Sequence, residues 1–102
     1  MEVAQYYLED LDIGMKAEFE REVTSESVQS FAEVSGDHNP LHLDKDYAEK
    51  TMFGGRIAHG MLSAGFISTI FGTIMPGRGS IYMSQNLKFT APVRHGDLVR
   101  AI

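Results

Sequence analysis

Hydrophobic and polar residues alternate along three stretches of the chain, as they do in half-buried strands. The first stretch covers residues 15–23, where only Arg21 interrupts the apolar face. The second covers residues 80–93, and the third begins at Leu98. Because successive side chains of a strand point to opposite faces, this period of two predicts a strand at each place.

Between the first and second of these strands, the pattern is that of helices. No Asp, Glu, Lys or Arg occurs from Ile57 to Met75, which predicts one long helix that is apolar nearly all round and ends at Pro76. The stretch is long enough for a membrane span, but His59 and several serines, threonines and glycines interrupt it. We therefore expect a helix buried inside a soluble fold rather than in a membrane.

Two shorter helices are predicted before it. Thr24 or Ser25 is a suitable N-cap for a helix that Gly36 ends. Its apolar stripe consists of Val28, Phe31 and Ala32, with Val34 as a further candidate. A second short helix is expected over residues 44–50.

This order of elements predicts an α+β fold. Consecutive strands should pair antiparallel, and only a curved sheet could wrap around so apolar a helix. We expect residues 1–102 to form a single domain, since no repeat or linker interrupts them. The chain ends at Ile102, inside the third predicted strand, so we also expect C-terminal strands of the sheet to be missing.

Composition and charge narrow the possible functions. A formal net charge of -5 argues against a protein that binds nucleic acid or an anionic membrane through bulk charge. The absence of cysteine excludes disulfides, thiolate zinc sites and thiol nucleophiles. The acidic N-terminal segment lacks the features of a signal peptide, so a cytoplasmic location is expected.

The segment SGDHNPLHLD, residues 35–44, carries the strongest chemical signal. Asp37 and His42 are five residues apart, which would not align them on one helical face. However, Asn39-Pro40 favours a turn, and a turn could bring both side chains to one side. A carboxylate and an imidazole that converge can hold a water molecule and exchange protons with it, and Asn39 could orient the same water.

Two other interpretations of this segment stay open. Asp and Asn are common turn formers that bond to nearby backbone, so the segment could be only a polar turn. A metal site formed by Asp37, His38, His42 and His59 is less favoured, because their spacing matches no known ligand pattern.

The second chemical feature is AHGM, residues 58–61, at the start of the long helix. The first backbone amides of a helix have no partner within it, so they suit a developing oxyanion. Gly60 allows a substrate carbonyl to approach its amide closely. Together with a pair that handles water, this predicts the addition of water to, or its loss from, a carbon conjugated to a carbonyl.

The chain contains, in this order, the segments FAEVSGDHNPLHLD, FGGRIAHGMLSAGFIS and PGRGSIYMSQNLKFTAPVRHGD. In these segments it resembles the MaoC-like (R)-specific enoyl-CoA hydratases, which have the hot-dog fold. The resemblance implies that Asp37 and His42 are the catalytic acid/base pair, with Asp37 as base and His42 as proton donor, although the sequence does not separate these roles. It also implies that Asn39 places the water, that the Gly60 amide receives the thioester oxygen, and that Ser68 supports the acidic residue.

The same resemblance implies hydration of trans-2-enoyl-CoA to (R)-3-hydroxyacyl-CoA, for polyester synthesis or a related pathway, with no metal or organic cofactor. It also implies a homodimer, with residues 80–89 as the candidate edge strand. Members of the family continue well beyond the position of Ile102. A dehydratase acting on acyl carrier protein substrates and a non-catalytic acyl-CoA-binding or scaffold protein remain as alternatives.

Overall fold

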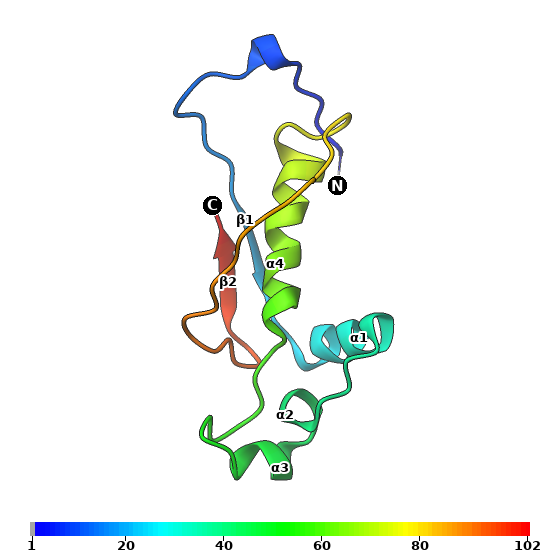
Figure 1. The fold of residues 1–102 in the computed structure, drawn as a ribbon, viewed down its shortest axis with the longest axis vertical. Coiled ribbons are helices and arrows are strands. Elements are labelled where there is room, and N and C mark those ends of the chain that lie inside the picture. Colours follow the sequence, from blue (N-terminus) through cyan, green and yellow to red (C-terminus); the bar gives the residue numbers. More distant parts are fainter. Residues whose placement is uncertain (1) are drawn as a thin grey trace.

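The computed structural model describes residues 2–102, which form an elongated body with extents of 52 × 25 × 23 Å. Its longest continuous helical stretch is α4 followed directly by η2, and α4 runs along the long axis, while α1, α2 and α3 lie together at one end (Figure 1). In chain order, the elements are η1 (Leu8–Asp10), β1 (Phe19–Glu22), α1 (Ser25–Ser35), α2 (Pro40–Leu43), α3 (Lys45–Glu49), α4 (Gly60–Thr69), η2 (Ile70–Ile74) and β2 (Leu98–Ala101).

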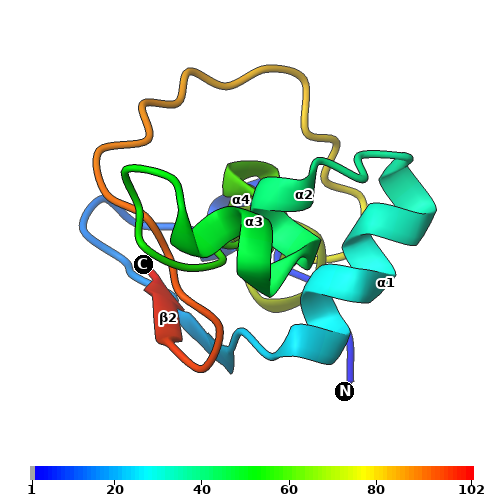
Figure 2. The same cartoon turned by 90° about the horizontal axis from the view of Figure 1, so that it is seen from below.

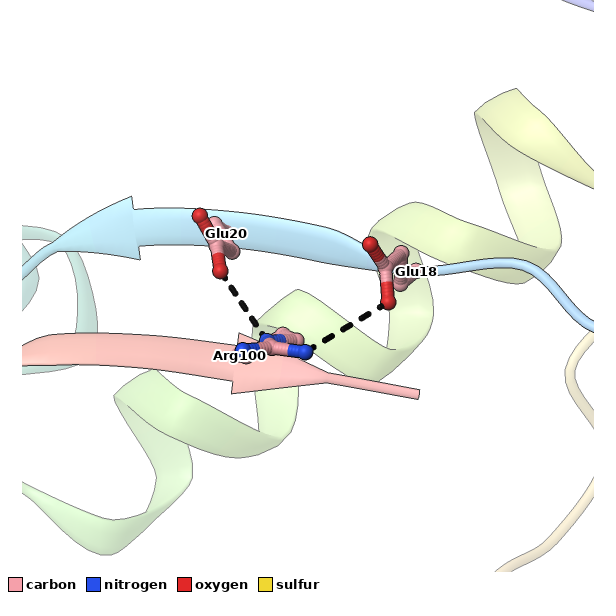
Figure 3. Close-up of polar contacts among 3 residues, drawn as sticks. All are labelled: Glu18, Glu20 and Arg100. Atoms are coloured by element: carbon pink, nitrogen blue, oxygen red, sulfur yellow. Dashed lines mark ion pairs between the residues drawn. The ribbon is translucent and has the colours of Figure 1, made fainter.

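The two strands form an antiparallel ribbon that packs against α4. The register pairs Phe19 with Ala101 and Glu22 with Leu98. On the exposed face of the ribbon, Arg100 pairs with Glu20 at 2.9 Å and lies 3.9 Å from Glu18 (Figure 3). The first and third predicted strands are therefore confirmed, although the first is shorter than the alternation of residues 15–23.

The helices α1 and α3 begin where the sequence predicts. The Thr24 side chain accepts a hydrogen bond from the Ser27 amide at 3.0 Å, and α1 ends at Gly36, whose φ of 82° is the left-handed conformation that glycine favours. The side chain of Asp44 caps α3 in the same way, so both predicted helices are confirmed.

The predicted stripe on α1 is confirmed at Val28 and Ala32, which are fully buried, but wrong at Val34, which is 84% exposed. Residues three or four apart share a helical face, and Val34 is only two residues beyond Ala32. It therefore points away from the face that packs on the core.

The long apolar helix starts later than the sequence predicts, and it is only partly covered. Ile57 forms a β-bridge with Arg94, and the Ala58 amide donates to the carbonyl of Val93 at 2.7 Å, so the backbone is engaged elsewhere until residue 59. Ala64 is buried, but Met61 is 52% exposed, because two strands cover one side of the helix only. Within residues 2–102 the helix is therefore only partly enclosed, as expected for a sheet that lacks strands. In this part of the chain no helix is long and apolar enough to cross a membrane.

Residues 80–93, predicted as a strand, form no strand in the described part of the chain. Ile81 and Met83 are 84% and 90% exposed, and the segment bows outward from the body (Figure 2). It returns to the body near Phe89, whose ring lies against Gly60. Alternation shows which side chains would share a face, but a strand also needs a neighbour that satisfies its backbone, and residues 2–102 offer none here.

Candidate active site

The carboxylate of Asp37 is fixed by the turn that follows α1. The Asp37 amide donates to the Ser35 hydroxyl at 3.1 Å, and that hydroxyl donates to the carbonyl of Phe31 at 2.7 Å. The Asn39 amide then donates to Oδ1 of Asp37 at 3.2 Å. Because short side chains that bond to nearby backbone stabilise turns, the segment itself orients the Asp37 carboxylate, which stays exposed.

The imidazole of His42 is oriented by α2, which carries it, and by the backbone of Ile57. Asn39 caps α2 by accepting from the Leu41 amide at 3.0 Å, and α2 carries the half-buried His42. Nδ1 of His42 lies 2.7 Å from the carbonyl oxygen of Ile57. Since a carbonyl only accepts, Nδ1 carries a proton, and Nε2 is an acceptor in the neutral ring and a donor in the imidazolium.

Asp37, His42 and His59 converge. Each offers one nitrogen or carboxylate oxygen, and these three atoms lie within 4.8 Å of one another. Two hydrogen bonds of about 2.8 Å each let one water molecule bridge groups at such a separation. The prediction that the bend at Asn39-Pro40 brings Asp37 and His42 together is confirmed.

His59, which the sequence suggested only as a candidate metal ligand, is the buried member of this cluster. Its residue is 3% exposed, and its Nε2 donates to the backbone carbonyl of Asp37 at 3.0 Å. Its ring stacks on that of His42 with centroids 3.8 Å apart and lies 4.7 Å from the ring of Phe31. The one signal in the sequence that could have identified it is its position within AHGM, just before the helix.

The same three residues are also the candidates for a metal site, because one ligand atom of each lies within 4.8 Å of the others. One nitrogen of each ring donates to a backbone carbonyl, which leaves one nitrogen per ring as a possible ligand. The less favoured metal interpretation of the sequence therefore stays a prediction.

An apolar cavity of about 320 Å³ opens beside His42. Gly60, the first residue of α4, contributes to its wall together with Phe89. A Cβ atom at position 60 would lie 2.8–3.0 Å from three ring atoms of Phe89, so only glycine fits without displacing that ring. The remaining lining residues are Phe53, Ile57, Ala58, Ser63, Thr90, Ala91, Pro92 and Val93.

The other residues that the sequence suggested lie less directly at this cluster. Asn39 uses its side-chain oxygen as a helix cap, so its role in placing a water stays a prediction. His38 is exposed and bonds only to the carbonyl of Gly36 at 3.2 Å. Ser68 lines a separate cavity of about 280 Å³ with Met61 and Tyr82, and the structure does not bring it to Asp37. Its supporting role stays a prediction.

A fourth histidine, His95, lies close enough to interact with the cluster, and the sequence gave no reason to select it. Its Nδ1 is 2.9 Å from the Ser25 hydroxyl, which ties the turn before β2 to the start of α1. Burial lowers the pKa of His95 below its ordinary 6.5, and the charge of Arg56 lowers it further. Charge on His42 and on His59 lowers the pKa of His95 as well, while the His42 backbone raises it.

Residues 10–102 match the model of the MaoC like domain. The chain belongs to the MaoC-like family. Within 96 residues it is 51% identical to an (R)-specific enoyl-CoA hydratase of Rhodospirillum rubrum, covering 94% of this chain and 67% of that protein. Within 98 residues it is 49% identical to a 3-hydroxybutyryl-CoA dehydratase of Methylorubrum extorquens, covering 96% of this chain and 62% of that protein.

The structure is also similar to that of the unliganded R-hydratase PhaJ1 from Pseudomonas aeruginosa. The TM-score is 0.85 at 49% identity, and the match covers 90% of this chain and 59% of that one. This MaoC-like chain therefore has the α+β hot-dog architecture of its structural neighbours, and it spans about three fifths of the length of this neighbour. The expectation that further strands follow residue 102 stays a prediction.

Proposed function

We propose that this MaoC-like protein is an (R)-specific enoyl-CoA hydratase, which adds water to a trans-2-enoyl-CoA to give the (R)-3-hydroxyacyl-CoA. The observation that carries the proposal is the convergence of Asp37 with His42, which lines an apolar cavity whose wall also includes Gly60. The (R)-specific enoyl-CoA hydratase of R. rubrum, 51% identical, supports it.

In the proposed reaction, one water molecule lies between the Asp37 carboxylate and Nε2 of His42. Asp37 takes a proton as the water oxygen forms a bond to the β carbon of the enoyl thioester. The electron pair of the double bond moves to the thioester oxygen, where the Gly60 amide stabilises the enolate. His42, which enters the step with a proton on both ring nitrogens, gives its Nε2 proton to the α carbon, and proton transfer from Asp37 to Nε2 restores the starting pair.

The cavity supports an acyl substrate, since its lining is mostly apolar and His42 stands at one side of it. The proposed reaction uses no metal ion and no organic cofactor, because the proton transfers and the oxyanion contact come from this chain's own groups. We also propose a homodimer formed through residues 80–89. The highly exposed Ile81 and Met83 on an unpaired segment support this assignment.

Crotonyl-CoA hydration, followed as the loss of absorbance of the conjugated thioester, tests the proposal. The purified protein should turn crotonyl-CoA over, and Asp37→Asn should lower kcat by at least about 10²-fold, the lower end of what a general base contributes. Asp46→Asn is the matched control, since Asp46 is an exposed residue of α3 and should leave the rate unchanged.

Three results would contradict the proposal. Binding of crotonyl-CoA without turnover would make the protein an acyl-CoA-binding module. Equal rates for wild type and Asp37→Asn would remove Asp37 from the chemistry. Faster turnover of the carrier-protein thioester than of the CoA thioester would favour a dehydratase of acyl carrier protein substrates.

A further inference from the structure

His59 contacts both members of the proposed catalytic pair, although it is 22 residues from Asp37 and 17 from His42 in the sequence. One edge of its ring donates to the Asp37 carbonyl at 3.0 Å, and one face lies against the His42 ring at 3.8 Å. Substrate does not reach it, because the residue is only 3% exposed and does not line the cavity.

We propose that His59 is a positioning residue that holds Asp37 and His42 at the separation needed to share one water molecule. This inference rests on the proposed function. The hydrogen bond from His59 holds the backbone carbonyl of Asp37 in place, and with it the Cα atom from which the carboxylate side chain extends. Its ring face limits rotation of the His42 imidazole, which is otherwise anchored only through Nδ1 to Ile57.

A simple packing role does not account for the residue type. Nδ1 of His59 is buried and has no hydrogen-bond partner among the described residues. An orphaned buried polar atom costs about 1–3 kcal/mol, and phenylalanine would fill the same space without that cost. Imidazole, however, provides a flat face and a hydrogen-bond donor on one rigid ring. The site uses both, on two different partners.

The two contacts can be removed separately. His59→Phe keeps the ring face under His42 but loses the donor to Asp37. His59→Gln keeps an N–H donor of similar reach but loses the face. Because misplacement of a catalytic group by about 1 Å can cost about 10²-fold in rate, each variant should lower kcat toward that factor. KM should change much less, since His59 does not line the cavity.

The experiment measures kcat and KM for crotonyl-CoA hydration by the purified protein and both variants, with thermal unfolding as a check of the fold. His38→Phe and His38→Gln are the matched controls, because His38 is exposed and its side chain contacts only the Gly36 carbonyl. They should keep the wild-type rate. Folded His59 variants with wild-type kcat would overturn the inference, as would a loss confined to KM.

Imidazole NMR on the wild type supplies a test that does not depend on the variants. The bond to Asp37 requires the proton on Nε2 of His59, and the bond to Ile57 requires it on Nδ1 of His42. Nitrogen shifts that place the His59 proton on Nδ1 would overturn the inference even if the variants fail to fold. A wild-type protein that hydrates no crotonyl-CoA instead contradicts the proposed function, and the tautomers then decide the inference alone.

Discussion

Replacing Gly60 by alanine tests the proposed oxyanion contact, because the added methyl group would clash with the ring of Phe89 beside the amide. The new Cβ would lie 2.8, 2.9 and 3.0 Å from Cε1, Cδ1 and Cζ of Phe89, and the first two distances are shorter than Cβ atoms approach other atoms in folded proteins. Position 60 is also the first residue of α4, where an amide would face the thioester oxygen. The methyl group therefore disturbs both the cavity wall at Phe89 and the Gly60 amide that would donate to the thioester oxygen.

The effect on stability should be small. Overpacking costs about 1–3 kcal/mol, and the low end applies because Phe89 is 59% exposed on an irregular segment and its ring can move. Alanine recovers part of this, since it is favoured over glycine in a helix by up to about 1 kcal/mol. The net change in unfolding free energy should be about 1 kcal/mol or less, which shifts Tm by less than about 8 °C.

The effect on activity should be large. Loss of one oxyanion donor costs about 10²–10³ in kcat, and Gly60→Ala should approach the lower value by keeping the thioester oxygen away from the amide. Crotonyl-CoA hydration and thermal unfolding, measured together, separate the two effects. Gly72→Ala is the matched control, because a Cβ there meets nothing within 4 Å. A folded Gly60→Ala protein with wild-type kcat would refute the reasoning about the amide, and a collapse in stability would refute the reasoning about Phe89.

Three further predictions concern stability. Thr24→Ala removes the cap of α1 and should lower the unfolding free energy by about 1 kcal/mol in urea, with an unchanged hydration rate as its control. The pKa of His95 is lower in the folded protein, so below pH 6.5 the unfolded chain binds the proton first and stability falls. His95→Gln should reduce the loss of urea stability as the pH falls below 6.5, and an unchanged slope would contradict this. Arg100→Gln breaks an ion pair with Glu20 whose side chains are 54% and 45% exposed, so it should cost less than about 1 kcal/mol, and a salt-insensitive loss would argue against an ionic cause.

The local parts of the site could be predicted from the sequence because they depend on neighbours in the chain. Asn39-Pro40 has one favoured conformation, and it determines that Asp37 and His42 meet. Thr24 and Gly36 bound α1 for the same reason, since a cap needs only the next few amides. Gly60 could be selected because it lies at a predicted helix start. The ring that makes glycine necessary there belongs to Phe89, 29 residues away.

The parts that depend on distant contacts could not be predicted in this way. Residues 80–93 have the pattern of a strand, but a strand exists only where another backbone pairs with it, and the pattern does not identify that partner. The extent to which α4 is buried could not be predicted for a related reason, because its composition shows which faces are apolar and not how much sheet covers them. The role of His59 depends on contacts with two residues across the turn, which no local signal reveals.

The two imidazoles at the site are both anchored to main-chain oxygens, those of Ile57 and Asp37. A carbonyl group is present whatever the side chain, so a change of amino acid at position 57 leaves the anchor of His42 in place as long as the backbone keeps its course. Substitutions at position 57 should therefore leave the orientation of the His42 ring unchanged. Mutational sensitivity should concentrate at the histidines themselves and at the residues that bend the chain around them.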